Sequence, residues 1–412
     1  MYVDLIIVME NRNQSIESLS TTITRRFLLT TTAISVGSVV TVAPVKGEEP
    51  TEIKDWNDLN AVRENLDADY VLMNDLDQST SGYDEYIGAP TSGWNPIGGR
   101  DSFTGTFDGN GHEITGLQIN RPDERTVGLF EVNKGNIRNL TLSDLDIIGE
   151  GTVGGLVGQN SDEVRGLRAS GNITGGSSTG GLVGSNVREA KVMRSAANCD
   201  VTGSSFVGGL VGSNFSDVRE SWATGPVSGD SGIGGLVGQN VDNIRETWAD
   251  GPTEGDSWVG GLIGLNDEDG EVMNSWSSGS VSGEEAIGGL VGRNLNEATV
   301  EAAYWDKNTS SHSEGVGSDE GGMTDITGLA TSEMQGDSAP DAMSELDFET
   351  IWTVQVESND YPKLRLEPTD DLESTTIVDD VPGFGIGSAL AGICGATYVF
   401  QRRLTETETD ST

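Results

Sequence analysis

Cysteine and histidine are nearly absent from this chain, which has two residues of each type among 412. Cys199 lies inside a repeated stretch, whereas Cys394 lies in an apolar segment near the C-terminus. Two such cysteines can form neither a disulfide framework nor a cysteine metal site. His112 and His312 alone also disfavour a histidine metal cluster or a repeated acid–base system. We therefore expect no metal, no cofactor and no catalytic residues, and predict that the protein is not an enzyme.

Aromatic and basic residues are also scarce. Aromatic residues make up 6% of the chain, which has 57 glycines, a composition that favours many short strands over thick globular packing. The 24 Lys and Arg residues face 66 Asp and Glu residues, giving a net charge of -42. This charge disfavours a nucleic-acid partner. At molar salt the Debye length falls to about 3 Å, so such a surface suits a protein of a salt-loving organism.

One stretch is abundant: Gly-Gly-Leu-(Val/Ile)-Gly-X-Asn occurs six times, and Val127 to Asn133 is a degenerate earlier copy. Measured on the second glycine, the copies are 26 or 28 residues apart, with 27 for the first interval. A fixed period of this size is the signature of a solenoid. The Gly-Leu pairs are Gly155-Leu156, Gly181-Leu182, Gly209-Leu210, Gly235-Leu236, Gly261-Leu262 and Gly289-Leu290, and the last residues are Asn160, Asn186, Asn214, Asn240, Asn266 and Asn294.

Each repeat contains short runs of Val, Ile, Thr and Trp separated by turn residues, without a helical apolar period. The sequence therefore predicts an all-β fold, a parallel β-solenoid in the right-handed form, with about seven coils. Stacked coils would place equivalent residues about 4.8 Å apart. Because an open end would expose unpaired strand edges, we expect a cap at each end.

The repeated positions then acquire structural roles. The glycines should allow coils to approach closely, and the asparagines should form a hydrogen-bonded ladder at one corner. If Ser221 and Ala223 point inward, the neighbouring aromatic rings point outward as an exposed column that could bind glycan or protein. The alternative is that these rings only shield the joints between coils. The column consists of Trp222, Trp248, Trp276 and Tyr304.

The motif resembles the GLUG repeat, named for Gly-Leu-any-Gly, over about residues 126–300. That family occurs in secreted and cell-surface bacterial and archaeal proteins, including adhesin-like molecules and a bacterial immunoglobulin A peptidase. The resemblance implies a structural module rather than a particular activity.

Both ends of the chain resemble export and anchoring signals. Arg25-Arg26 before the mild apolar run 33–43 resembles a twin-arginine export signal, with translation expected from Met9 and cleavage near Gly47. Near the other end, Pro382-Gly383-Phe384 precedes an apolar stretch and a basic pair, and resembles the archaeal PGF-CTERM sorting signal. That resemblance implies removal by an archaeosortase and a lipid anchor, although here a tail, 404–412, follows the basic pair.

These observations predict seven segments: an export signal (1–47), an N-terminal cap (48–125), the solenoid (126–300), a C-terminal cap (301–366), an acidic linker (367–380), a membrane or sorting segment (381–403) and an acidic tail (404–412).

Three further sets of residues have alternative interpretations. Arg194, Glu220 and Glu246 share one column, with Arg219 and Arg245 beside it, which could be a carbohydrate-cleaving site but is more simply a row of surface ion pairs. Two groups of oxygen-bearing side chains could bind calcium, but are more simply turns. One group is Asp108, Asn110 and Glu113, and the other is Asp267, Glu268, Asp269 and Glu271. The N-glycosylation sequons begin at Asn139, Asn172, Asn308 and Asn214, of which Asn214 also belongs to the asparagine ladder.

We therefore predict an extracellular, surface-anchored, structural or adhesin-like solenoid of a haloarchaeal cell envelope. The alternative is a carbohydrate-active β-helix enzyme. The expected partners are envelope or S-layer components and glycans, the export and archaeosortase machinery, and the membrane through the C-terminal segment or a lipid.

Overall fold

The computed structural model describes residues 49–99, 101–187, 189–322, 324–354 and 359–365. The chain divides into two units, of which Glu48–Glu367 contains all of these residues. The predicted export signal, acidic linker, sorting segment and acidic tail lie outside the described residues, as do both basic pairs.

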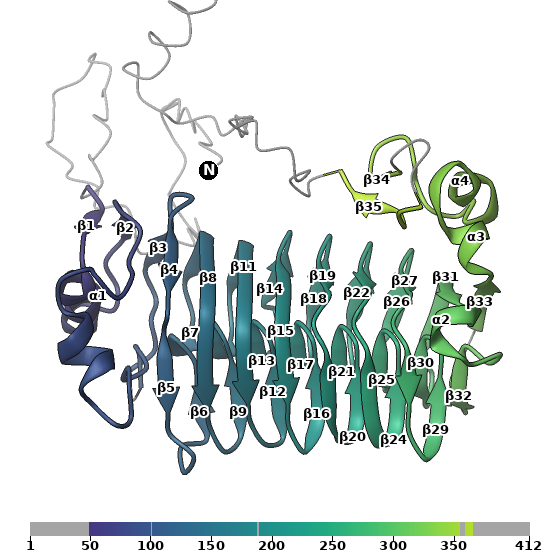
Figure 1. Ribbon diagram of the computed structural model, residues 1–412, viewed down its shortest axis with the longest axis horizontal. Coiled ribbons are helices and arrows are strands. Elements are labelled where there is room, and N and C mark those ends of the chain that lie inside the picture. Colours follow the sequence, from purple (N-terminus) through teal and green to yellow (C-terminus); the bar gives the residue numbers. More distant parts are fainter. Residues whose placement is uncertain (1–48, 100, 188, 323, 355–358, 366–412) are drawn as a thin grey trace, which may run out of the picture. The chain divides into compact units, whose positions relative to one another are not determined.

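The repeats form parallel sheets in which each coil pairs with the next (Figure 1). In the described part of the chain, one sheet takes one strand from each of eight coils, and its strands pair like with like, as Val157 with Val183 and Asn160 with Asn186. The strands are β7 (Phe130–Asn133), β10 (Val157–Asn160), β13 (Val183–Asn186), β17 (Val211–Asn214), β21 (Val237–Asn240), β25 (Ile263–Asn266), β30 (Val291–Asn294) and β32 (Val316–Asp319). The all-β parallel solenoid is thus confirmed, with one coil more than the expected seven.

A second sheet takes up the other sides of the coils and joins 25 of the described strands, of which eighteen belong to the coils and seven to the end segments described below. The early coils have long strands, whereas later coils divide the same path into shorter ones. These strands are β8 (Asn136–Ile148), β9 (Thr152–Gly154), β11 (Glu163–Thr174), β12 (Ser178–Gly180), β14 (Lys191–Met193), β15 (Ala196–Thr202), β16 (Ser205–Gly208), β18 (Asp217–Arg219), β19 (Trp222–Ala223), β20 (Val227–Gly234), β22 (Asn243–Arg245), β23 (Trp248–Ala249), β24 (Thr253–Gly260), β26 (Glu271–Met273), β27 (Trp276–Ser277), β28 (Val281–Ser282), β29 (Glu285–Gly288) and β31 (Thr299–Asp306).

The corner that divides these strands uses a left-handed backbone conformation in successive coils. Gly166 has φ of 67°, and the non-glycine residues of the column have φ between 49° and 56°. L residues rarely adopt this region, but one per coil turns the chain sharply without breaking the stack. The non-glycine members are Asn139, Arg194, Glu220, Glu246, Asn274 and Ala302.

The solenoid core is formed by the repeated apolar residues. The motif leucines from Leu156 to Leu290 are all 0% exposed. The motif glycines allow this packing, because a Cβ built on Gly209 would lie 2.2 Å from the carbonyl oxygen of Gly235 in the next coil. Close approach between coils is therefore a steric requirement for glycine at this position.

The motif asparagines form a continuous ladder within the protein. From Asn133 to Asn266, each Nδ2 atom donates to the Oδ1 atom of the next asparagine, at 2.8 to 3.0 Å. The ladder ends where Asn294 Nδ2 donates to Asp319 Oδ1 at 2.9 Å. A carboxylate suits this last position because it only accepts hydrogen bonds, and the carboxylate of Asp319 also accepts from Gly321 N and Thr324 Oγ1.

Non-repeating segments pack at the two ends of the solenoid (Figure 1). At the N-terminal end these are β1 (Thr51–Ile53), α1 (Trp56–Ala61), η1 (Val62–Glu64), β2 (Tyr70–Leu72), η2 (Asp84–Gly88), β3 (Thr106–Asp108), β4 (Glu113–Thr115), β5 (Gln118–Asn120) and β6 (Thr126–Val127). At the C-terminal end these are α2 (Lys307–Ser310), β33 (Thr324–Leu329), α3 (Thr331–Met334), η3 (Gly336–Ser338), α4 (Ala339–Ala342), β34 (Trp352–Thr353) and β35 (Lys363–Leu364).

Candidate functional site

The aromatic column lies where successive coils place the same residue on neighbouring strands. Trp222 of β19 pairs with Trp248 of β23, which pairs with Trp276 of β27, and Trp276 pairs with Tyr304 of β31. The ring centroids of Trp222 and Trp248 are 6.0 Å apart and those of Trp248 and Trp276 are 5.0 Å apart, with planes 6° apart in both pairs. The register of the parallel strands thus produces a stack of rings.

The predicted exposure of this column is wrong. Trp222, Trp248, Trp276 and Tyr304 are 8%, 4%, 1% and 4% exposed. Large aromatic side chains each bury about 150–250 Å² when covered, so the hydrophobic effect favours covering them. Residues of the C-terminal segments supply the cover: Leu329, Met334, Ala339, Met343, Leu346, Trp352 and Leu364 form one apolar cluster with the column.

Tyr361 extends the aromatic stack from the C-terminal segments. Its ring lies 5.3 Å from that of Trp276, with an angle of 21° between the planes. Its hydroxyl donates to Asp306 Oδ2 at 2.6 Å, and Asp306 also accepts from Asn308 N as the N-cap of α2. Burial and this hydrogen bond to a carboxylate raise the pKa of Tyr361 well above its usual range. The column is therefore a docking surface within the chain.

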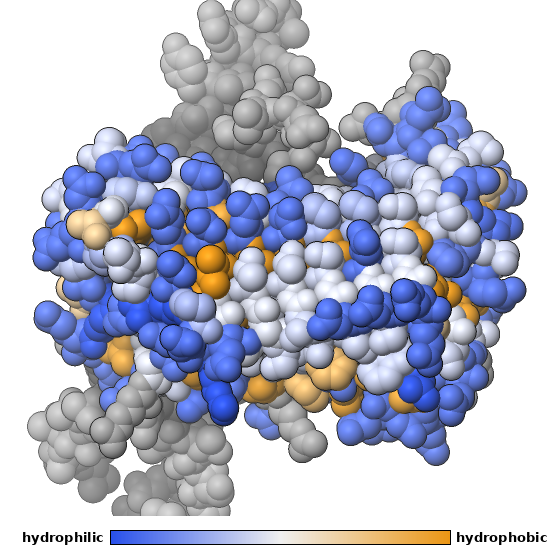
Figure 2. Space-filling model, turned by 60° about the horizontal axis from the view of Figure 1, so that its bottom comes forward, coloured by the Kyte–Doolittle hydropathy of each residue, from blue (hydrophilic) through white to orange (hydrophobic). Residues whose placement is uncertain are grey.

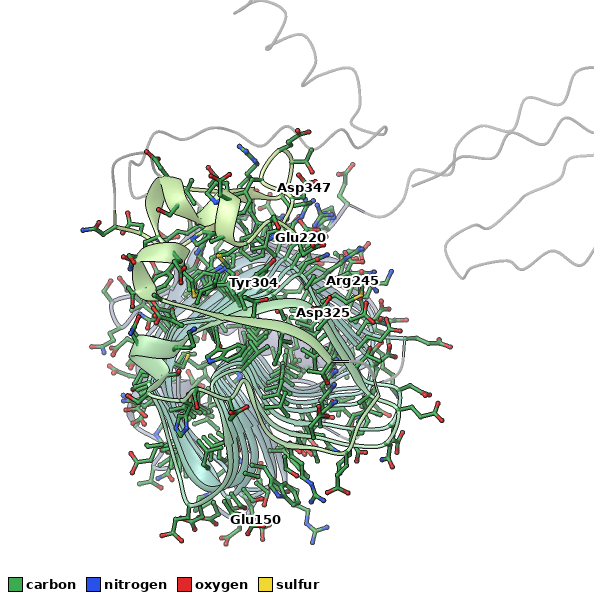
Figure 3. All side chains as sticks on the ribbon, turned by 90° about the vertical axis from the view of Figure 1, so that its right-hand side faces the viewer. Glu150, Glu220, Arg245, Tyr304, Asp325 and Asp347 are labelled. Atoms are coloured by element: carbon green, nitrogen blue, oxygen red, sulfur yellow. The ribbon has the colours of Figure 1, made fainter. Side chains whose placement is uncertain are left out.

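The charged column occupies the left-handed corner. Arg194 Nε lies 2.8 Å from Glu220 Oε2, and Arg219 and Arg245 approach Asp217 at 3.5 and 3.7 Å. Figure 3 shows Glu220 and Arg245 on one side of the coils, with Glu150 at the opposite edge. The Arg194–Glu220 and Arg245–Asp217 pairs thus link neighbouring coils, whereas the Arg219–Asp217 pair lies within one strand.

Glu246 is the member of this charged column whose ionised form is disfavoured by its surroundings. Burial, and then the nearby Glu220 carboxylate, raise the pKa of Glu246. Since the folded protein holds the proton more tightly than the unfolded chain, the destabilising effect of ionisation is absent at low pH and grows as pH rises through the raised pKa.

We therefore expect Glu246→Gln to unfold at a higher temperature than the wild type at about pH 8. Its free energy of unfolding should be higher by less than about 1 kcal/mol, because the site is partly solvated. Near about pH 4 the two proteins should unfold at the same temperature. Thermal melts across this range provide the measurement, with exposed Glu254→Gln as the control. A stability gain that did not depend on pH would contradict the electrostatic explanation.

The two suggested calcium groups have other contacts in the structure. Asp108 Oδ1 accepts from Asn110 N at 2.9 Å and Asp108 Oδ2 pairs with Arg138, while Asp267 Oδ1 accepts from Glu268 N at 2.8 Å. Among the described residues, no group of three or more His, Cys, Asp and Glu side chains has a metal-binding arrangement.

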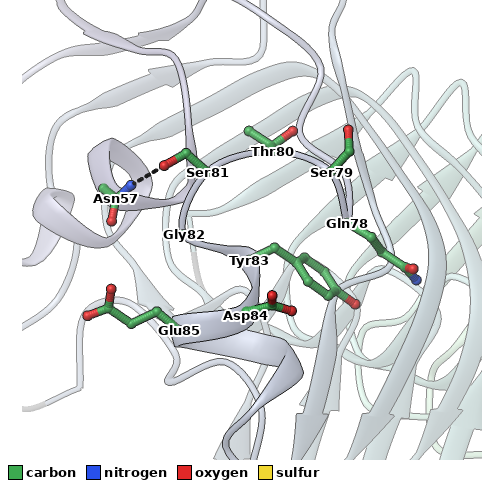
Figure 4. Close-up of a pocket in the computed structure, with 9 residues that line it drawn as sticks. All are labelled: Asn57, Gln78, Ser79, Thr80, Ser81, Gly82, Tyr83, Asp84 and Glu85. Carbon is green, nitrogen blue, oxygen red and sulfur yellow. Dashed lines mark hydrogen bonds between the residues drawn. The ribbon is translucent and has the colours of Figure 1, made fainter.

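A shallow pocket of about 380 Å³ in the N-terminal cap has no counterpart in the sequence-based predictions (Figure 4). It lies between α1 and η2, where Asn57 Nδ2 donates to Ser81 Oγ at 3.1 Å. No motif marks it, because its residues come from a helix and a turn outside the repeats. Its lining is Asn57, Gln78, Ser79, Thr80, Ser81, Gly82, Tyr83, Asp84 and Glu85.

No helix of the described residues is long and apolar enough to cross a membrane. The predicted sorting segment, 381–403, lies outside the described residues.

No protein-family model matches the chain. Among curated proteins, it is 31% identical over 135 residues to Halomucin of Haloquadratum walsbyi, matching 31% of this chain and 2% of that protein. It is 38% identical over 121 residues to a protein of Evansella cellulosilytica provisionally named a Gly-rich membrane protein, matching 27% of this chain and 13% of that protein. The chain thus corresponds to a small part of each relative.

Two solved structures are similar in fold. One, from Bacteroides ovatus and provisionally named an immunoglobulin A1 protease, has a TM-score of 0.49 and 16% identity, covering 77% of this chain and 93% of that one. The other, IgA1 Protease, has a TM-score of 0.42 and 15% identity, covering 82% of this chain and 26% of that one.

At such low identity the likeness concerns the fold alone. Both structures carry the name of a protease, so the prediction that this protein is not an enzyme is withdrawn, while the likeness itself assigns no activity to this chain. The chain is a β-solenoid with partial sequence similarity to a halophilic archaeal protein and to a bacterial membrane protein.

Proposed function

We propose that this protein is exported to the cell surface, where its solenoid serves as a structural or adhesive element of the envelope. The partial similarity to Halomucin and to a Gly-rich membrane protein carries this proposal. The net charge of -42 supports it, because molar salt screens the self-repulsion of such a surface. The stacked coils offer a long lateral surface for contacts with other envelope components.

The finer part of the proposal rests on sequence motifs. Arg25-Arg26 would direct twin-arginine export, and Pro382-Gly383-Phe384 would direct C-terminal sorting by an archaeosortase with attachment to the membrane through a lipid. The repeats between them would act as GLUG modules. Partners of this protein would be envelope or S-layer components and glycans.

We further propose that glycosylation occurs first at Asn172. This residue is exposed on β11, between Asp146 and Asp200 of the neighbouring coils. The other sequons are less available: Asn214 is fully buried in the ladder, Asn139 Nδ2 donates to Asp108, and Asn308 Oδ1 accepts from Thr331 N. Asn172 is therefore exposed, and its side-chain amide has no hydrogen-bond partner among the described residues.

Mass spectrometry of the mature protein from the membrane of its native cells tests the proposal. We expect an N-terminus near Gly47, a C-terminus near Pro382 with a lipid, and glycan mass on the peptide that contains Asn172. Protease treatment of intact cells should also digest the solenoid. An uncleaved protein found only inside the cell would refute the surface role, whereas a cleaved but unmodified protein would refute only the lipid and glycan assignments.

A further inference from the structure

Two partly exposed aromatic residues outside the buried column lie at one bend of the solenoid. We define the bend strip as Phe206 of β16, Gly232 of β20 and Trp258 of β24. Each lies two residues before the Gly-Gly motif of its coil. Strand register places them in one file, because Ser205 pairs with Ser231 and Ser231 pairs with Ser257. Phe206 and Trp258 are both partly exposed.

The backbone of the bend strip is sterically unfavourable for its side chains. Phe206 and Trp258 have φ of 48° and 55°, in the left-handed region that large L residues rarely adopt. Gly232 lies between them with φ of 71°, and a Cβ there would lie 2.8 Å from Phe206 Cδ1. The ring of Phe206 thus lies over Gly232 of the next coil. The next coil has Ala286 at this place with φ of 53°, so the left-handed turn recurs at this corner, and Phe206 and Trp258 are the large side chains that it carries.

Polar groups flank the bend strip. Ser257 Oγ donates to Ser231 Oγ at 3.0 Å, and the guanidinium carbon of Arg293 lies 5.4 Å from the Trp258 ring. Asp230 and Asp256 are exposed two residues before Gly232 and Trp258. Carboxylates and hydroxyls accept hydrogen bonds from sugar hydroxyls, while the negative charge repels polyanions.

We propose that the bend strip binds a neutral glycan, and this proposal rests on the adhesive role proposed above. Phe206 and Trp258 are two coils apart, or about 10 Å at the spacing of parallel strands. Each ring offers an apolar face to one sugar of the same oligosaccharide, and the flanking Asp and Ser side chains bind its hydroxyls. β16, β20 and β24 run along the lower edge in Figure 1, and Figure 2, which brings that side forward, shows a broad pale surface with separate hydrophobic spots.

Calorimetric titration of the whole protein tests the proposal, with maltohexaose, cellohexaose, chitohexaose and, as a polyanion, chondroitin sulfate. At about 1 M NaCl the Debye length is about 3 Å, so nonspecific charge effects are suppressed. We expect at least one neutral hexasaccharide to bind and chondroitin sulfate not to bind. The double variant Phe206→Ala with Trp258→Ala should bind at least about tenfold more weakly.

Two controls separate binding from folding. Met73→Ala removes an apolar side chain that is 37% exposed in the N-terminal cap and should leave affinity unchanged. Trp258→Phe should retain most of the affinity, because an aromatic face remains. Absence of binding to every neutral hexasaccharide, or equal binding by the wild type and a folded double variant, would overturn the proposal. Surface exposure on intact cells, measured separately, would still stand in that case.

Discussion

Gly235→Ala is expected to lower the free energy of unfolding by about 3 kcal/mol, because added volume in a packed interior costs about this much. A Cβ at this position would lie 2.2 Å from the Gly261 carbonyl oxygen and 3.0 Å from Ala249 Cβ. The first neighbour is backbone of the next coil, so relief requires the coils to separate. Urea unfolding in high salt measures the loss.

Gly99→Ala is the matched control for this substitution. The added Cβ would lie 2.9 Å from Glu131 Oε2, the far end of a flexible side chain that can move. We expect Gly99→Ala to change stability by less than about 1 kcal/mol. Equal effects of the two alanine substitutions would show that coil-to-coil contact is not what requires glycine in the motif.

Asn214→Ala is expected to destabilise the protein by about 2–4 kcal/mol, because it interrupts the buried ladder. Asn214 Nδ2 donates to Ser216 O and to Asn240 Oδ1 at 2.6 and 2.8 Å, and its Oδ1 accepts from Asn186 Nδ2 at 2.9 Å. The truncation leaves a donor and an acceptor without partners on either side of the gap. Urea unfolding again provides the measurement.

Asn214→Asp tests the direction of the ladder. A carboxylate there cannot donate to Asn240 Oδ1, so we expect a loss at least as large as that of alanine at neutral pH, decreasing as acid protonates the new group. Asn172→Ala, on the exposed surface, is the control and should have little effect. A similar small loss at Asn214 and Asn172 would contradict the structural role of the ladder.

The period of the sequence was sufficient to predict the solenoid, because like residues in successive coils must share one environment. Glycine, leucine and asparagine columns follow directly from that register. The eighth coil was missed because Val316-Gly317-Ser318-Asp319 lacks Gly-Gly-Leu and ends in aspartate. Its Val-Gly-X-Asx pattern, 25 residues after Val291, was the available signal.

The environment of the aromatic column could not be predicted in the same way. Repeat register shows that Trp222, Trp248 and Trp276 share a face, but their cover comes from residues 329–364, which have no period. The contact between Tyr361 and Trp276 joins residues far apart in the chain without a shared motif. The bend strip was missed for a different reason: Phe206 and Trp258 occur in alternate coils, so they do not form a column in the sequence.

Spin-label distances between coils test the stacked register most directly. In a chain carrying Cys394→Ser, cysteines at Gln159 and Gln239 mark sites three coils apart, and cysteines at Gln159 and Arg293 mark sites five coils apart. Native Cys199 is buried, which raises the pKa of its thiol to about 12, so it should stay unlabelled. The stacked solenoid predicts mean distances that differ by about 10 Å, or about 4.8 Å for each added coil. Distances that do not increase with coil number would contradict it.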